Sequence, residues 1–409
     1  MSTGSIVVVG GTGAVGRELV GLLARGPDEV VVVGRNGDRA AAVAAAAAAR
    51  SRARVSARRA DVTVAADRRA ALAGATIVVT CVERANVEVA RAALDEGAHV
   101  VDVSASADVL AAIASLDDLA RWHGRSAVLS VGLAPGLTNL LARACVERLP
   151  DAARVDITVL VGLGERHGAD AIRWTLDALT AAPATHPTRT EPTRTDPAGT
   201  DRAGPRHAGA GPRRTGTTRT NPTGTGPTRT EPPRTDRAGA GPDDAGVDAG
   251  LAARPARVAI PGFGERTAQP FPFADQHVLR ASLGIPVTTR LCFDSRAVTA
   301  AAFALRPVLR RLARAPAARA AVVRALGGIH LGGDRYAVTV TATAADGRRA
   351  TAHARGRRQS HATAVVTAHV VRRLRERGVP PGVHHVDGAV DVGKALVEVE
   401  AAGITVRRP

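Results

Sequence analysis

The chain has 409 residues and a formal net charge of +17, with 55 basic and 38 acidic side chains. All basic residues except Lys394 are arginine, they are spread along the chain, and aromatic residues make up only 2% of it. A nucleic-acid interface combines clustered positive charge with aromatic residues, so we expect a solvated basic surface and neither nucleic acid nor a membrane as partner. Three isolated cysteines and a first strand close to the N-terminus predict a cytoplasmic protein without disulfides or a signal peptide.

Short apolar runs alternate with helical patterns over residues 1–131. Helical spacing is clear at 14–26 and 86–97, between apolar runs of strand length. The expected strands are 5–10, 29–34, 54–62, 75–82, 97–104 and 126–132. Strands that alternate with helices predict an α/β domain with a doubly wound parallel sheet.

A low-complexity stretch, 183–255, follows a predicted strand at 154–162 and a predicted helix at 165–180. It repeats the pentapeptides TRTEP, TRTDP and TRTNP, is dense in Pro and Gly, and offers no residues that could anchor a core. We expect a disordered insert that a surface loop tolerates.

Order is expected to resume near residue 256. An apolar strand is predicted at 287–294 and a helix at 298–314. Two alternating runs over 334–356 meet at Asp346-Gly347, which predicts a hairpin with a type I′ turn. A helix should follow at 360–378, with Ser360 as its N-cap. We therefore expect a second α+β domain, formed by 132–182 and 256–356, with a mostly antiparallel sheet.

The stretch GGTGAVG ends the first strand and opens the first helix. Its glycines satisfy G-x-G-x-x-G, in which they permit a tight turn, a close approach of a pyrophosphate, and packing of helix on strand. The helix N-terminus offers N–H groups and positive potential to phosphates. The predicted cofactor contacts are Gly10, Gly11, Thr12, Gly13, Ala14, Val15 and Gly16. The motif in this context predicts a Rossmann domain, 1–131, that binds a dinucleotide.

The ends of the next strands predict further cofactor contacts. Arg35 and Asn36 follow the second strand, where an acidic residue would bind the ribose of NAD. Arginine can instead pair with a 2′-phosphate, which favours NADP over NAD. Asp61 and Val62 should meet the adenine, and Cys81 and Val82 the ribose and nicotinamide. We expect Cys81 to be a packing residue and not a nucleophile.

Several stretches carry a resemblance to a known family. They are GGTGAVGRELV, VVVGRN, ALDEGAHVVDVSA, VGLAPGLTNLLA, GERHGADAIRWTL and FPFADQHVL, and together they span nearly everything outside the insert. With them the chain resembles the saccharopine dehydrogenase-like (saccharopine reductase) family of NAD(P)-dependent oxidoreductases, and its arginine-rich composition resembles that of an actinobacterial member. The resemblance implies a homodimer, a small-molecule substrate, and a C-terminal segment, 357–409, that packs back on the Rossmann domain.

The resemblance also implies a reaction, the reduction of an imine formed from an amine and a carbonyl compound. Relatives resemble one another in a G-x-D-P-G turn, whereas this chain has GLAPG, with Ala134 in place of the aspartate. We therefore expect hydride transfer to an imine or carbonyl of another small, amino-acid-like substrate. The alternative is a non-catalytic NADP-binding redox sensor that has lost the catalytic group.

Three residues are the candidates for catalysis. Asp102 ends the fifth strand, although a role as a helix cap is also open. Asn139 follows the GLAPG turn and could hold a carboxylate or amide, and His167 follows a Gly-rich bend and could act as an acid. His384 and His385 are adjacent and have no acidic or cysteine cluster beside them, so no metal site is predicted.

Overall fold

The structure, a computed structural model, describes residues 4–409 except 52, 166–168, 181–253, 329–330 and 377. Residues 183–253 of the predicted insert and the candidate acid His167 lie outside the described residues. None of the described helices combines the length and apolar character that a membrane-spanning segment needs.

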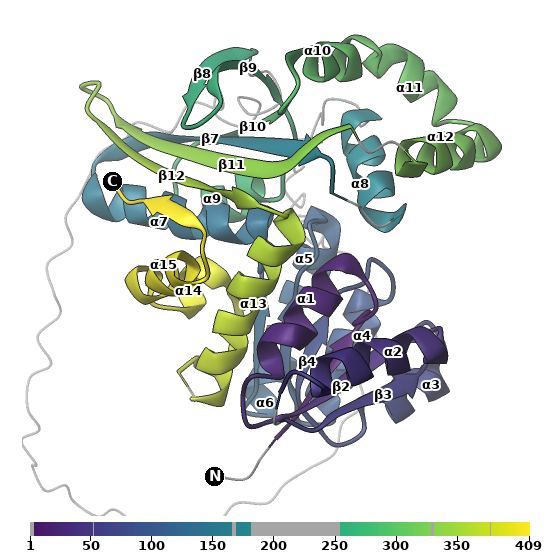
Figure 1. Cartoon of the computed structure of the whole chain (residues 1–409). Coiled ribbons are helices and arrows are strands. Elements are labelled where there is room, and N and C mark those ends of the chain that lie inside the picture. Colours follow the sequence, from purple (N-terminus) through teal and green to yellow (C-terminus); the bar gives the residue numbers. More distant parts are fainter. Residues whose placement is uncertain (1–3, 52, 166–168, 181–253, 329–330, 377) are drawn as a thin grey trace, which may run out of the picture. The chain divides into compact units, whose positions relative to one another are not determined.

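Seven strands form a parallel sheet, called sheet A here, in the order β13-β6-β5-β4-β1-β2-β3. Figure 1 labels β2, β3 and β4 of this sheet. Every neighbouring pair in it runs parallel, as predicted for a doubly wound sheet. Its strands are β1 (Ser5–Val9), β2 (Glu29–Gly34), β3 (Val55–Arg59), β4 (Ala75–Thr80), β5 (His99–Asp102), β6 (Ser126–Leu129) and β13 (Gly382–His385).

Helices cover both faces of sheet A because alternate residues of its strands point to opposite faces. In β1, Ile6 and Val8 pack toward α1, whereas Val7 and Val9 pack toward α4 and α5. The helices that connect these strands are α1 (Ala14–Leu23), α2 (Gly37–Ala48), α3 (Ala65–Leu72), α4 (Asn86–Asp95), α5 (Ala107–Ala114) and α6 (Asp117–Trp122). The near-continuous Val and Ile runs of the strands therefore reflect burial on both sides.

A second sheet, called sheet B here, has the order β14-β12-β11-β7-β10-β9-β8. Only β7 and β10 pair in parallel, and its other pairs are antiparallel, as predicted. Its strands are β7 (Ala152–Leu163), β8 (Ala256–Ile260), β9 (Gly264–Pro270), β10 (Val287–Phe293), β11 (Leu331–Ala344), β12 (Arg349–Arg357) and β14 (Thr405–Arg407). The accompanying helices are α7 (Thr138–Arg148), α8 (Ala169–Thr180), α9 (Asp275–Leu283), α10 (Arg296–Ala304), α11 (Arg306–Leu312) and α12 (Pro316–Gly328).

The C-terminal residues contribute to both sheets. Helix α13 (Gln359–Arg375) packs beside α1 (Figure 1). Strand β13 extends sheet A next to β6. Strand β14 then joins the edge of sheet B next to β12. Two short helices, α14 (Val386–Ala389) and α15 (Val392–Ala401), lie between these strands in the sequence and pack on α7.

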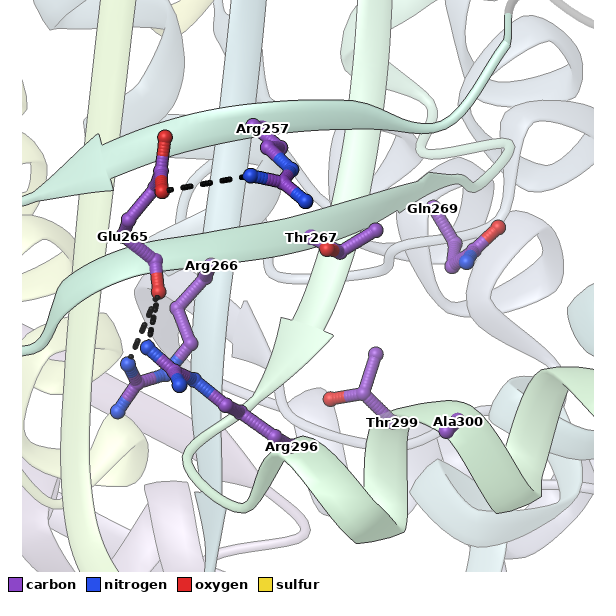
Figure 2. A pocket seen from close by; sticks show the side chains of 8 residues that line it. All are labelled: Arg257, Glu265, Arg266, Thr267, Gln269, Arg296, Thr299 and Ala300. Atoms are coloured by element: carbon purple, nitrogen blue, oxygen red, sulfur yellow. Dashed lines mark hydrogen bonds and ion pairs between the residues drawn. The ribbon is translucent and has the colours of Figure 1, made fainter.

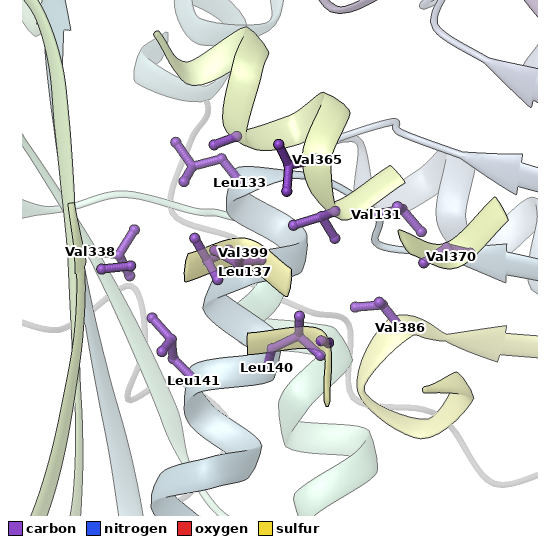
Figure 3. Close-up of a cluster of buried hydrophobic side chains, with 14 of the residues drawn as sticks. Val131, Leu133, Leu137, Leu140, Leu141, Val338, Val365, Val370, Val386 and Val399 are labelled. Atoms are coloured by element: carbon purple, nitrogen blue, oxygen red, sulfur yellow. The ribbon is translucent and has the colours of Figure 1, made fainter. Parts of the chain in front are cut away.

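A buried apolar cluster joins these C-terminal helices to α7. Figure 3 shows Leu137, Leu140 and Leu141 between Val338 of β11 and the valines of α13. Val399 of α15 lies in the same cluster and is 1% exposed. The segment that starts at residue 133 is thus held from three sides by apolar contacts.

The hairpin between β11 and β12 has a different turn from the type I′ turn predicted at Asp346-Gly347. The N–H of Ala344 donates to the carbonyl of Arg348, and the N–H of Gly347 donates to the carbonyl of Ala344. Gly347 has φ of +88°, but Asp346 is not among the residues with positive φ. A type I′ turn needs positive φ at both central residues, so the hairpin instead closes with a three-residue loop whose last residue is glycine.

Two helix predictions also needed correction. The helix expected at 298–314 is divided into α10 and α11, because Pro307 lacks an N–H and its ring would clash with the preceding turn. Ser360 is not the N-cap of α13. Instead, the Glu165 carboxylate accepts hydrogen bonds from the backbone N–H groups of Gln359 (2.6 Å) and Ser360 (3.2 Å). A carboxylate from a distant part of the sequence therefore caps this helix.

We expect Val399→Ala to lower the free energy of unfolding by about 1.5–3 kcal/mol, because it removes buried methyl groups from the apolar cluster. Val397→Ala is the matched control, since Val397 lies on the same helix and is 51% exposed. Replacing valine by alanine raises the intrinsic helix propensity equally at both positions, so a difference in stability between the two variants reflects the difference in burial. Denaturant unfolding measures the difference. Equal midpoints for the two variants would show that α15 does not contribute to the core.

Candidate functional site

Parallel pairing places the carboxyl ends of all seven strands at one edge of sheet A. The chain order reverses between β1 and β4, where β1 has β2 on one side and β4 on the other. Such a switch point is where open α/β sheets bind ligands, at the carboxyl ends of the strands. The predicted contacts that follow β1, β2, β3, β4 and β5 are all at this edge.

The loop after β1 is shaped by two glycine positions. Gly10 has φ of +78°, and a Cβ atom there would lie 2.5 Å from the carbonyl oxygen of Cys81. A Cβ atom at Gly16 would lie 2.4 Å from the carbonyl oxygen of Gly10 and 2.6 Å from the Cα of Gly11. Any side chain at Gly16 would push helix α1 away from the loop.

The N-terminus of α1 is open for an anion. Gly13 is its N-cap, and no side chain of the described residues caps the helix there. Gly13 is exposed, and a Cβ atom at this position would meet only the Gly10 carbonyl oxygen, at 3.3 Å. The first N–H groups of the helix can therefore face a pyrophosphate, which fits a dinucleotide at this loop.

Charged and polar groups gather after β2 and β3. Arg35 is exposed, and its positive charge is one of the causes that lower the pKa of Asp61. The larger cause is hydrogen bonding, because the hydroxyl and the N–H of Thr63 both donate to Asp61 Oδ1, at 2.7 and 3.1 Å. Asn36 caps α2 by accepting from the N–H of Arg39 at 2.8 Å. Arg35 therefore projects from a fixed turn, whereas Asn36 has a structural role that the sequence did not predict.

Cys81 and Val82 follow β4 beside the glycine loop. The N–H of Cys81 donates to the carbonyl of Val9 at 2.8 Å, which fixes the start of this segment. Burial raises the pKa of the Cys81 thiol to about 12, with a smaller contribution from the charge of Asp102. The thiol is therefore protonated at neutral pH, which agrees with a packing role. Val82 lies against Gly10, where a Cβ atom would be 2.7 Å from its Cγ1.

Asp102 is fully buried at the end of β5. Its carboxylate accepts hydrogen bonds from the Thr80 hydroxyl, from Asn86 Nδ2 at 2.9 Å and from the Ser104 N–H at 2.9 Å. Burial raises its pKa above the usual range despite these bonds. Ser106, and not Asp102, caps the next helix, α5. The side chain therefore ties β4, α4 and the loop after β5 together at the site edge.

The stretch VGLAPGLTN follows β6 and includes a non-helical turn at Leu133–Leu137. Ala134 is the one residue of this stretch that is partly exposed, and its peptide bond to Pro135 is cis. A Cβ atom at Gly136, where φ is +138°, would lie 3.2 Å from the carbonyl oxygen of Ser130. The turn is folded tightly back on the end of β6, and it presents a methyl group where a longer side chain could stand.

Asn139 supports this turn from the start of α7. Its Oδ1 accepts from the N–H of Gly136 at 2.9 Å, and its Nδ2 donates to Asp387 Oδ1 at 3.4 Å. Asp387 is buried and also contacts Arg143 and Ser282, at 3.4 and 3.2 Å. Because both ends of the buried Asn139 amide have protein partners, its contacts position the turn.

Asp275 is a buried acid beside the same turn. No pattern in the sequence predicted a role for it. It starts α9, and its Oδ1 accepts from the hydroxyl of Thr138, while Oδ2 has no hydrogen-bond partner among the described residues. Burial raises its pKa to about 7, and the charge of Asp387 adds to the shift. The only signal in the sequence was its position in the stretch FPFADQHVL.

A second unpredicted pair holds the end of β6. The Ser130 hydroxyl and His385 Nδ1 lie 2.9 Å apart, and Ser130 has φ of +58°. Burial lowers the pKa of His385, so the ring is neutral at physiological pH. Ser130 and His385 are 255 positions apart in sequence, and local patterns cannot pair such residues. Among the described residues, no group of three or more potential metal ligands lies together.

A family model covers most of the strands and loops described above. Residues 6–128 match the family model described as the saccharopine dehydrogenase NADP binding domain. The matched residues include the glycine loop and the ends of β2 to β5. Comparison with curated protein sequences gives no match.

Solved structures extend the likeness to the whole chain. The apo saccharopine dehydrogenase (L-Glu forming) of Saccharomyces cerevisiae is similar over 99% of this chain and 99% of its own, with a TM-score of 0.58 and 13% identity. A short-chain dehydrogenase of Sphingobium yanoikuyae in complex with NADPH covers 31% of this chain and 71% of its own, at TM-score 0.26 and 16% identity. The first match shows that the part of the chain that the structure describes has the fold of the yeast enzyme.

We expect Gly16→Ala to weaken NADPH binding at least about tenfold, because the added Cβ forces α1 away from the loop that would hold the pyrophosphate. Gly21→Ala is the matched control on the same helix, since a Cβ atom there meets nothing within 4 Å. The control should bind NADPH as the wild type does. Isothermal titration calorimetry measures both, and unchanged affinity of Gly16→Ala would contradict the assignment of the cofactor loop.

We also expect a pH dependence of stability that comes from Asp275. Its native pKa of about 7 exceeds the unfolded value of about 3.9, so the native state retains a proton that the unfolded state releases. The free energy of unfolding therefore falls as pH rises through this window, by at most about 1.4 kcal/mol per pH unit from this group.

Denaturant unfolding of the wild type and Asp275→Asn between pH 5 and 7.5 measures this effect. The stability of the wild type relative to Asp275→Asn should fall as pH rises, because the amide cannot release a proton. The control Asp108→Asn removes an exposed carboxyl group. A relative stability that rises with pH would show that Asp275 is ionised in the native state.

Proposed function

We propose a reaction from the premise that this chain is an NADP-dependent oxidoreductase, with residues 6–128 matching the saccharopine dehydrogenase NADP binding domain. In the proposed reaction, the chain transfers a hydride to an imine or carbonyl of a small, amino-acid-like substrate. The bound cofactor would supply the hydride. The observation that supports the proposal most directly is the shared edge of sheet A. The uncapped N-terminus of α1 follows β1, and the turn that contains Ala134 follows β6. Strands β6, β5, β4 and β1 are consecutive neighbours in sheet A, so these groups and the ends of β4 and β5 share one edge.

The cofactor contacts are proposed residue by residue. The N–H groups that follow Gly13 would bind the pyrophosphate, and the Arg35 guanidinium would pair with the 2′-phosphate. Val62 and Asp61 would border the adenine, and Cys81 and Val82 the ribose and nicotinamide. These roles rest on position at the sheet edge and on the geometry of the glycine loop.

The substrate is proposed to lie against the turn that contains Ala134. Reduction of an imine forms a C–H bond from the hydride and an N–H bond from a proton, and reduction of a carbonyl forms C–H and O–H bonds. The carboxyl group of Asp102 and the amide of Asn139 are buried and bonded to protein groups, so we propose that both position the site and do not touch the substrate. His167, as the acid, stays a prediction.

The methyl group of Ala134 defines the expected substrate class. It leaves the accessible part of the turn without charge, so the turn offers no carboxylate that could bind the ammonium group of an amino acid. We therefore propose a substrate whose reacting carbon lies against a neutral surface, with any carboxylate held by backbone N–H groups. A homodimer, a cytoplasmic location and the absence of a nucleic-acid partner stay predictions.

We expect Arg35→Glu to reverse the cofactor preference. Loss of the guanidinium should weaken NADPH binding about tenfold or more, and the carboxylate can accept a hydrogen bond from the 2′-hydroxyl of NADH. Arg39→Glu is a control with the same charge change at another exposed arginine, in the first turn of α2. Fluorescence titration with both cofactors measures the ratio, and an unchanged ratio would exclude Arg35 as the phosphate contact.

The reaction is tested by following NADPH absorbance with mixtures of amines and oxoacids and with simple carbonyl compounds. Wild type and Gly21→Ala should oxidise NADPH with at least one mixture, and Gly16→Ala should not. NADPH binding without turnover of any mixture would contradict the proposed reaction and favour the non-catalytic redox sensor.

A further inference from the structure

A hollow with a positively charged lining lies at the β9-β8 end of sheet B. It has a volume of about 360 Å³ and lies between β9 and α10. Figure 2 shows its lining of Arg257, Glu265, Arg266, Thr267, Gln269, Arg296, Thr299 and Ala300. With three arginines and one glutamate, the lining has a formal charge of +2. This volume falls in the range of small-molecule pockets.

Two of the arginines converge on one neutral acceptor. The guanidinium groups of Arg266 and Arg296 both donate to the backbone carbonyl of Glu265, at 3.1 and 2.9 Å (Figure 2). This shared carbonyl holds two positive groups close together without neutralising either. Among the described residues, no carboxylate forms an ion pair with Arg266 or Arg296. Two like charges held together in this way favour an anion between or beside them.

The remaining charges leave this positive potential in place. Arg257 approaches the Glu265 carboxylate only to 3.9 Å, with the two side chains 79% and 62% exposed, so their attraction is weak. The Nε of Arg266 is buried and has no hydrogen-bond partner among the described residues. Arg266 also lines a neighbouring hollow that includes Arg335 and Asp294. The Asp294 carboxylate there accepts from the N–H groups of Ser295 and Gly333, both at 2.9 Å.

We propose that this hollow binds the phosphate group of a small phosphate monoester, at a site separate from the cofactor loop. A phosphate monoester carries nearly two negative charges at neutral pH, which matches the formal charge of the lining. Its three terminal oxygens suit the three guanidinium groups, whose planar forks bind such oxygens in pairs. Thr267 and Gln269 add polar groups for the rest of the molecule. Because the hollow is on sheet B and the cofactor loop is on sheet A, the site would be distinct from the cofactor site.

The test is isothermal titration calorimetry of the full chain with glycerol 3-phosphate, with and without saturating NADPH. We expect saturable binding that NADPH does not displace. Arg296→Gln and Arg266→Gln should each weaken it about tenfold or more, the usual effect of losing a charged hydrogen bond. Arg296 is exposed, so its variant should fold, and circular dichroism checks both.

Matched controls separate this site from the general positive charge of the chain. Arg91→Gln removes an exposed arginine from α4, outside the hollow, and should leave the affinity within twofold of the wild type. Succinate, a dicarboxylate, should bind more weakly than glycerol 3-phosphate at matched ionic strength. The proposal is overturned by absent saturation, displacement by NADPH, an equal loss in Arg91→Gln, full binding by Arg296→Gln, or tighter binding of succinate.

Discussion

At Gly16 the first turn of α1 lies directly against the loop that leaves β1. A Cβ atom at this position would be 2.4 Å from the carbonyl oxygen of Gly10, so only glycine permits the contact. The same contact directs the N-terminus of α1 toward the space above β1 and β4, where the order of sheet A reverses. In the proposed site, the position of the cofactor, and hence of any substrate beside it, would depend on this close approach.

The second half of the site depends on buried polar groups as well as on Gly136, whose φ is +138°. The turn that contains Ala134 is held by Asn139, by the Thr138 contact to Asp275, and by Ser130 with His385. A buried polar group without a partner costs free energy, so these bonds keep the turn in one arrangement. The ionisable side chains beside the turn, Asp275 and His385, are thus bonded to residues that build it. In the proposed site the turn can be uncharged, because the cofactor would supply the hydride.

Patterns of short range carried most of the fold prediction. The alternation of apolar runs such as 29–34 with helical spacing gave the parallel sheet, and the period of two in 334–356 gave the hairpin. The type I′ turn was wrong because Asp346 keeps a negative φ and the loop has a third residue. The N-cap of α13 was wrong because Glu165, which is remote in sequence, competes successfully with Ser360 for the N–H groups. The roles of Asp275, Asp387 and His385 could not be predicted, since their partners are more than 100 positions away.

The central claim is that one bound NADPH has its pyrophosphate at the glycine loop and its nicotinamide at the turn that contains Ala134. An experimental structure of the chain with NADPH tests it most directly. The account predicts the pyrophosphate at the N–H groups after Gly13, the 2′-phosphate at Arg35, and the nicotinamide beside Ala134. A nicotinamide ring away from this turn, or a 2′-phosphate with no contact to Arg35, would contradict it.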